Sequence, residues 1–111
     1  MPMNRRFNPD IKAALDVLLL DIPGVSEGKS FGYPAYKVNG KVFAWVGGDG
    51  IGLKLPRPRV EALIAADDAI SPFEPVEGTV WKAWVSIDRA PDAYAGDMPL
   101  FEEAIAFVTG G

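Results

Sequence analysis

The dipeptide Asn39-Gly40 is the feature that most constrains how this chain can fold. It lies between residues 31–38 and 41–47, two stretches rich in aromatic and β-branched side chains. A two-residue type I′ turn needs positive φ at both central positions, which Asn and Gly tolerate well. The sequence therefore predicts an antiparallel hairpin here. A second turn around Gly48-Asp49 extends it to a three-stranded meander over residues 31–56.

The turn lengths predict which residues face each other across the strands, and facing residues share one side of the sheet. The predicted pairs are Val38 with Lys41, Tyr36 with Phe43, Ala35 with Ala44, Val46 with Ile51, and Ala44 with Leu53. One side is then aliphatic. Residues 80–88 alternate as a further strand, with Trp81 on the side of Val85 and with Lys82 on the side of Trp84. The candidate binding face is the opposite side of the sheet, formed by Tyr36, Phe43, Trp45, Lys54, Lys82 and Trp84.

Three segments have the pattern of helices, over residues 8–24, 56–68 and 98–108. The first has Asn8 as a plausible N-cap and Pro9 at the first helical position. The proline-rich residues 71–80 suggest a loop or an edge segment, and residues 89–97 suggest a loop. The order is α-β-β-β-α-β(β)-α. It predicts one domain, residues 1–111, of the two-layer α+β class, with helices packed on one face of an antiparallel sheet.

The composition excludes several kinds of chemistry. The 111 residues include no cysteine and no histidine, so thiol nucleophiles, disulfides, histidine acid–base catalysis and the usual zinc ligands are absent. We name no catalytic, cofactor-binding or metal-binding residue and expect a non-enzymatic protein. The longest apolar run, residues 17–20, is too short to span a bilayer. We expect a cytoplasmic protein without membrane contact.

Two weaker motifs have plain structural interpretations. The glycine-rich residues 47–52 lead into a strand and not into a helix, so a hairpin turn is favoured over a phosphate-binding loop. The acidic neighbours Asp67-Asp68, Glu74/Glu77 and Glu102-Glu103 lie at helix ends or in a loop. Hard-metal binding is the alternative for these carboxylates.

The charge is unevenly distributed along the chain. Residues 28–60 hold six basic side chains against Asp49 alone, whereas the whole protein has a net charge of −4. Lysines and aromatic rings on one open sheet face can bind a protein partner or a second copy of the chain, and they can also stack on bases of a nucleic acid. The rings can instead be covered by the chain's own residues 73–78, which begin with Phe73. A protein partner or homodimer is the leading hypothesis, and nucleic-acid binding is the alternative.

Several segments together resemble a known family. They are "KSFGYPAYKVNGKVFA" at residues 29–44, "LKLP" at 53–56, "FEP" at 73–75, Gly78 and "WKAWVSI" at 81–87. This set resembles the N-terminal domain of the TfoX/Sxy family over about residues 25–108, and it is similar to the related MmcQ/YjbR family. The resemblance implies an α+β fold and a link to transcription-related regulation. Two departures are Ser30 in place of a common methionine, and Tyr33 in place of the histidine of the MmcQ/YjbR turn. A second, helical C-terminal domain is also not expected here.

Overall fold

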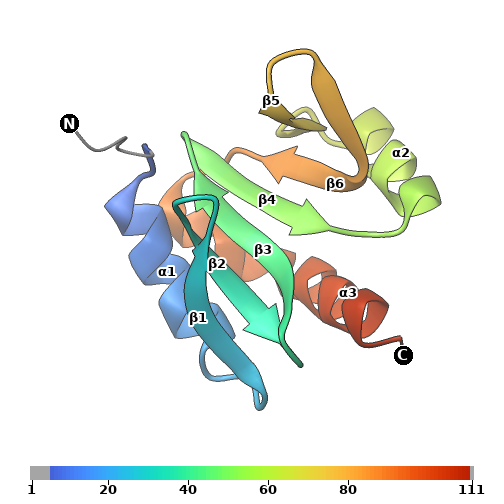
Figure 1. Ribbon diagram of the computed structural model, residues 1–111. Helices are drawn as coiled ribbons and strands as arrows, with labels where there is room; N and C mark the ends of the chain where they lie inside the picture. The colour runs from blue at the N-terminus through green and yellow to red at the C-terminus, as the bar shows by residue number, and fades with distance from the viewer. Residues whose placement is uncertain (1–5, 111) are drawn as a thin grey trace.

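The computed structural model describes residues 6–110, which form a six-stranded antiparallel sheet and three α-helices (Figure 1). The strand order is β1-β2-β3-β4-β6-β5, so β1 and β5 are the two edges. The predicted α+β class is confirmed. In chain order the elements are α1 (Pro9–Leu19), β1 (Val25–Ser30), β2 (Tyr33–Val38), β3 (Lys41–Gly47), β4 (Gly50–Lys54), α2 (Arg57–Ala66), β5 (Ile70–Val76), β6 (Thr79–Ile87), the 3₁₀ helix η1 (Pro91–Asp97) and α3 (Met98–Thr109).

The helices begin and end where local chemistry allows it. The Asn8 side chain accepts a hydrogen bond of 2.8 Å from the backbone N–H of Asp10, and Pro9 opens α1, as predicted. At the other end of the chain, Gly110 has a φ of 77° and terminates α3. Residues 89–97 differ from the predicted loop, because most of them form η1.

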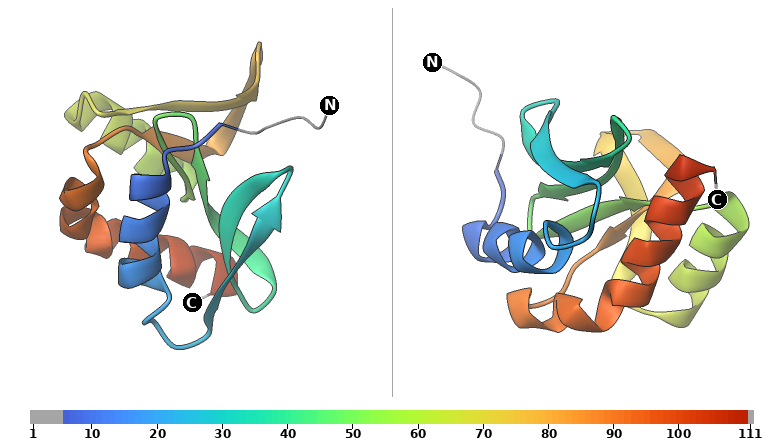
Figure 2. Two further views of the ribbon diagram at one scale, coloured as in Figure 1. Left: turned by 90° about the vertical axis from the view of Figure 1, so that its left-hand side faces the viewer. Right: turned by 90° about the horizontal axis from the view of Figure 1, so that it is seen from below.

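All three α-helices cover the same face of the sheet and leave the other face without a helix (Figure 2). The core between the layers joins side chains of α1 and α3 to those of the central strands, including Leu15, Phe101, Leu53 and Val85. Burying these aliphatic and aromatic groups is the main favourable contribution to folding. None of the helices in residues 6–110 is long and apolar enough to cross a membrane.

Both turns of the predicted meander form. Asn39 and Gly40 have φ values of 53° and 75°, and Val38 faces Lys41. At the next turn, Val46 faces Ile51 and Ala44 faces Leu53, as predicted. One strand is additional, since β1 pairs with β2 through the two-residue turn Phe31-Gly32. The edge alternative for residues 71–80 is also confirmed, because β5 forms an edge of the sheet.

A β-bulge in β3 overturns the other two predicted pairs. Lys37 faces Val42, but Tyr36 faces Ala44, so Phe43 has no partner across the hairpin. The extra residue breaks the alternation, so residues between the bulge and the Asn39-Gly40 turn lie on the face opposite to the predicted one, whereas those from Ala44 onward keep theirs. Tyr36 and Phe43 therefore lie in the helix-covered core, both 0% exposed, and their assignment to the open face is wrong.

Candidate binding site: an aromatic cleft on the open face

The open face of the sheet carries a cluster of six aromatic rings centred on Trp45. The ring of Trp45 lies 5.2–6.4 Å, centroid to centroid, from each of the other five. It stacks on Trp84 at an interplanar angle of 29° and meets Phe31 edge-on at 80°. We call this group the aromatic cluster; its members are Phe31, Tyr33, Trp45, Phe73, Trp81 and Trp84.

An irregularity between β5 and β6 brings Trp81 into this cluster. Pro72 faces Val85, yet the next residue, Phe73, faces Trp81, so β6 has three unmatched residues between these two pairs. Strict alternation predicted Trp81 on the side of Val85, which is wrong. The ring of Trp81 instead lies 5.9 Å from Phe73 and 6.1 Å from Trp84.

Two glycines give the rings room to lie against the sheet. A Cβ atom on Gly52 would lie 2.6 Å from the ring of Phe73, and one on Gly47 would lie 3.0 Å from the ring of Tyr33. Real Cβ contacts are not as close as 2.6 Å, so a larger residue at position 52 would displace Phe73, and one at position 47 would press tightly on Tyr33. The glycine-rich segment thus forms the predicted hairpin turn and also provides bare sheet surface for the two rings.

Between these rings the face is hollowed into a cleft of about 370 Å³. Five members of the aromatic cluster line it, and only Trp84 does not. Of the described residues that line the cleft, Glu74 alone carries a charge. Its carboxylate accepts a hydrogen bond of 2.6 Å from the backbone N–H of Gly78, which holds it at the β5–β6 turn. The volume is within the range of sites that bind small molecules or single side chains.

Phe31 stands at the mouth of this cleft in an unusual conformation. It is 70% exposed, and its φ of 54° is rare for a residue with a large side chain. Beneath it, Trp45 is only 5% exposed, and its indole Nε1 is shielded from solvent without a hydrogen-bond acceptor among the described residues. The positive φ at Phe31 and Gly32 is that of a two-residue hairpin turn, and it presents an exposed aromatic ring beside the buried ring of Trp45.

A comparison with protein-family models identifies the family. The YjbR model matches residues 20–105, which include every strand of the sheet and most of α3. The chain belongs to the YjbR family. YjbR is not a known family of enzymes. The TfoX/Sxy resemblance is not confirmed by this match and stays a prediction. Neither the curated proteins nor the solved structures contain a match to the chain.

The YjbR fold brings together only part of the predicted binding face. Trp45 and Trp84 lie in the aromatic cluster but are 5% and 7% exposed, because neighbouring rings, Phe73 among them, cover them. The Lys54 ammonium lies 6.0 Å from the centroid of the Trp84 ring. Lys82 is exposed on β6. The binding role of these four residues stays a prediction.

The acidic neighbours do not converge on a metal site. No group of three or more metal-ligating side chains occurs within residues 6–110. Glu103 pairs with Arg59 at 2.9 Å, which joins α3 to α2. Asp67 accepts from the Ala69 backbone N–H at 2.9 Å and from Arg89 at 2.7 Å.

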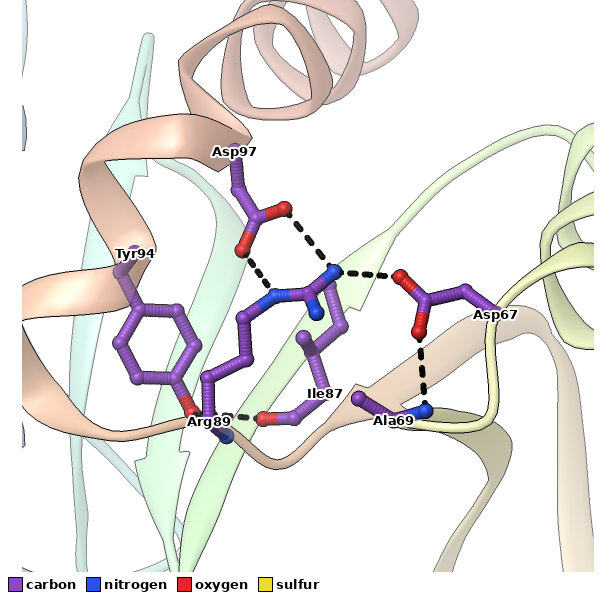
Figure 3. A network of polar contacts seen from close by, with 6 residues as sticks. All are labelled: Asp67, Ala69, Ile87, Arg89, Tyr94 and Asp97. Atoms are coloured by element: carbon purple, nitrogen blue, oxygen red, sulfur yellow. Dashed lines mark hydrogen bonds and ion pairs between the residues drawn. The ribbon is translucent and has the colours of Figure 1, made fainter.

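Figure 3 shows that Arg89 is the centre of a larger polar network. Its guanidinium donates two hydrogen bonds to Asp97, at 2.7 and 3.1 Å, in addition to the one to Asp67. The Arg89 hydrogen bond is the main reason that the pKa of Asp67 lies below its ordinary value. The Tyr94 hydroxyl donates to the Ile87 carbonyl at 2.7 Å. These groups all have partners, so the network serves to fix η1 against the sheet.

Phe31, Tyr33 and Trp81 are site residues that the sequence-based interpretation missed. A signal for the first two was present, since Phe31-Gly32 separates two short strand-like segments by two residues, with glycine at the second position. Trp81 had no such signal. Its place depends on the irregular pairing of β6, which the alternation of residues 80–88 does not reveal.

Proposed function

We propose that this YjbR domain is a non-enzymatic, cytoplasmic interaction module that binds a segment of a partner protein in its aromatic cleft. The observation that carries the proposal is the cleft itself, a hollow of about 370 Å³ bordered by five aromatic rings on the face that no helix covers. Aromatic side chains in such hollows are the residues that contribute most to protein–protein binding.

The charge of the molecule favours a protein partner over a nucleic acid. The net charge is −4 with a pI of about 4.7, and the one charged lining residue is the carboxylate Glu74. A phosphate backbone is repelled by both. Lys54 beside Trp84 is the feature that supports the nucleic-acid alternative, because a base can stack on a ring while a lysine contacts phosphate.

Random 12-residue peptides displayed on phage and selected against the intact chain would test the proposal. The chain's three tryptophans, Trp45, Trp81 and Trp84, all belong to the aromatic cluster, so intrinsic fluorescence reports directly on the cleft. We expect selected peptides to change this fluorescence and to bind Phe31→Ala at least about fivefold more weakly.

Val17→Ala is the matched control, because Val17 is 76% exposed but belongs to α1, in the helical layer. It should bind the peptides like the unchanged chain. Peptides that bind Phe31→Ala with full affinity would contradict the proposal. Quenching by single-stranded oligonucleotides that salt removes would favour the nucleic-acid alternative instead. A dimer's mass in light scattering that Phe31→Ala reduces would identify the partner as a second copy of the chain.

A further inference from the structure

The cleft has an electrostatic character that restricts the group it can hold, given the proposed function of binding a partner segment. Aromatic rings present negative potential on their faces, and the one charged lining residue, Glu74, is an anion. No cationic side chain lines the cleft within the described part of the chain. Charge complementarity therefore favours a cation over a neutral or anionic group.

Most of the lining rings lie at steep angles to one another, and Tyr33 is nearly parallel to Trp45, at 22°. Phe31 lies at 80° to Trp45 and at 68° to Trp81, and Trp45 lies at 52° to Trp81. Parallel rings would form a slot for a flat group. Rings at these angles form a corner with several walls, which suits a rounded group that touches more than one ring at once.

The aromatic cluster already holds one cation. The Lys54 ammonium lies over Trp84, 6.0 Å from the ring centroid, and Trp84 stacks on the cleft residue Trp45 at 5.2 Å. This contact is within the usual range of cation–π interactions. One ring of this cluster thus already has a cation against its face, beside the rings that line the cleft.

The side chains that line the cleft offer a cation few hydrogen-bond acceptors. Three lining side chains, those of Tyr33, Glu74 and Ser86, have an oxygen that can accept a hydrogen bond. The Glu74 carboxylate already accepts one from Gly78. An unmodified ammonium has three N–H donors that lose water on entry. A methylated ammonium has fewer donors or none, and it sheds water more readily.

We propose that the aromatic cleft recognises a methylated lysine side chain of the partner segment, with the rings around the methylammonium group and the Glu74 carboxylate opposite its charge. Phe31 and Trp81 supply two of the walls, and the largely covered ring of Trp45 lies at the base. The site requires no covalent chemistry.

Three versions of one short peptide test this assignment. They differ at a single position, which is lysine, trimethyllysine, or the uncharged residue in which a carbon atom replaces the nitrogen of trimethyllysine. Tryptophan fluorescence measures binding to the full chain. We expect the trimethyllysine peptide to bind at least about fivefold more tightly than the other two. Equal binding of the uncharged peptide would overturn the proposal, and so would equal binding of the lysine peptide.

A matched pair of variants isolates the carboxylate. Glu74→Gln keeps an oxygen that can accept from Gly78 and should weaken the trimethyllysine peptide roughly two- to fivefold while leaving the uncharged peptide unchanged. Glu77→Gln makes the same charge change at an exposed residue of the same turn that does not line the cleft, and should change neither. Equal effects of the two variants would overturn the role of Glu74.

Failure of this inference is distinguishable from failure of the proposed function. Phage-selected peptides that lack a cationic group but depend on Phe31 would overturn the methyllysine assignment and leave the interaction module intact. Free choline that binds as tightly as the trimethyllysine peptide would show that the site serves a small molecule and would overturn the assignment to a protein side chain.

Discussion

The ring of Phe73 packs directly on Gly52, on the face of the sheet opposite the helices. A Cβ at position 52 would lie 2.6 Å from Cε1 of Phe73. Phe73 in turn contacts Trp45 and Trp84, at 5.4 and 5.6 Å between ring centroids. Gly52 thus sets the height at which the aromatic cluster lies above the sheet.

Gly52→Ala should displace Phe73 and destabilise the protein by about 1–3 kcal/mol, as overpacking does elsewhere. The tryptophan fluorescence should change with it. Gly96→Ala is the control, because no atom lies within 4 Å of its added Cβ and its φ is not positive. Urea denaturation measures both variants. A Gly52→Ala protein with unchanged stability and spectrum would show that the contact does not constrain the cluster.

Tyr36→Phe should cost about 1–2 kcal/mol of unfolding free energy. The Tyr36 hydroxyl donates a 2.7 Å hydrogen bond to Asp16 on α1, and the ring beneath it stays equally buried in the variant. Lys12 continues to pair with Asp16 at 2.6 Å, so the carboxylate keeps a partner. The urea midpoint is the measurement. No loss of stability would mean that water replaces the tyrosine hydroxyl without cost.

Stability should fall as the pH rises above about 10, the ordinary pKa of tyrosine. Burial is the main reason that the pKa values of Tyr36 and Tyr94 are raised, and the hydrogen bond to Asp16 adds to the shift at Tyr36. A raised pKa means that the folded state favours the protonated phenol, so its contribution is complete below that pH and is lost above it. Urea midpoints from pH 8 to 11 should fall less steeply in Tyr36→Phe. Identical slopes would contradict the assignment.

Arg89→Met should destabilise the protein by roughly 1–3 kcal/mol, because Asp97 is only 6% exposed and would lose both of its hydrogen bonds from Arg89. Arg89→Lys keeps the charge but not the pair of hydrogen bonds to one carboxylate, so its stability should lie between those of the unchanged protein and Arg89→Met. Thermal unfolding compares the three proteins. Full stability in Arg89→Lys would show that charge alone is sufficient.

The stability of the protein should also decrease at low pH. The hydrogen bond from Arg89 lowers the pKa of Asp67, so the folded state favours its charged form. That contribution is present above the ordinary pKa of about 3.9 and is lost as the pH falls through the lower folded value. In Arg89→Met the decrease in stability below pH 4 should be shallower. An equally steep decrease would assign the acid sensitivity to other carboxylates.

Local sequence determined much of the architecture. Asn39-Gly40 specifies its turn because both residues accept positive φ, and Asn8-Pro9 specifies the start of α1 because the side chain and the ring suit those two positions. These are interactions between residues close in sequence, so the pattern of residues alone predicts them. The two-layer arrangement was also predictable, because alternating strands and periodic helices each have one apolar face that must be buried.

The candidate site depended on the tertiary structure. One unmatched residue in β3 turns Tyr36 and Phe43 toward the helices, and three in β6 turn Trp81 toward the open face. Side-chain alternation has a period of two, so a bulge puts the residues on its two sides out of step, and the predictions hold on one side of it only. With the bulge in place the Tyr36 hydroxyl contacts Asp16, twenty residues away in the chain, and a local pattern does not reveal such a contact. The sequence by itself determined most of the strands and their turns, whereas the bulge in β3 and the irregular pairing of β5 with β6 decided which rings form the cleft.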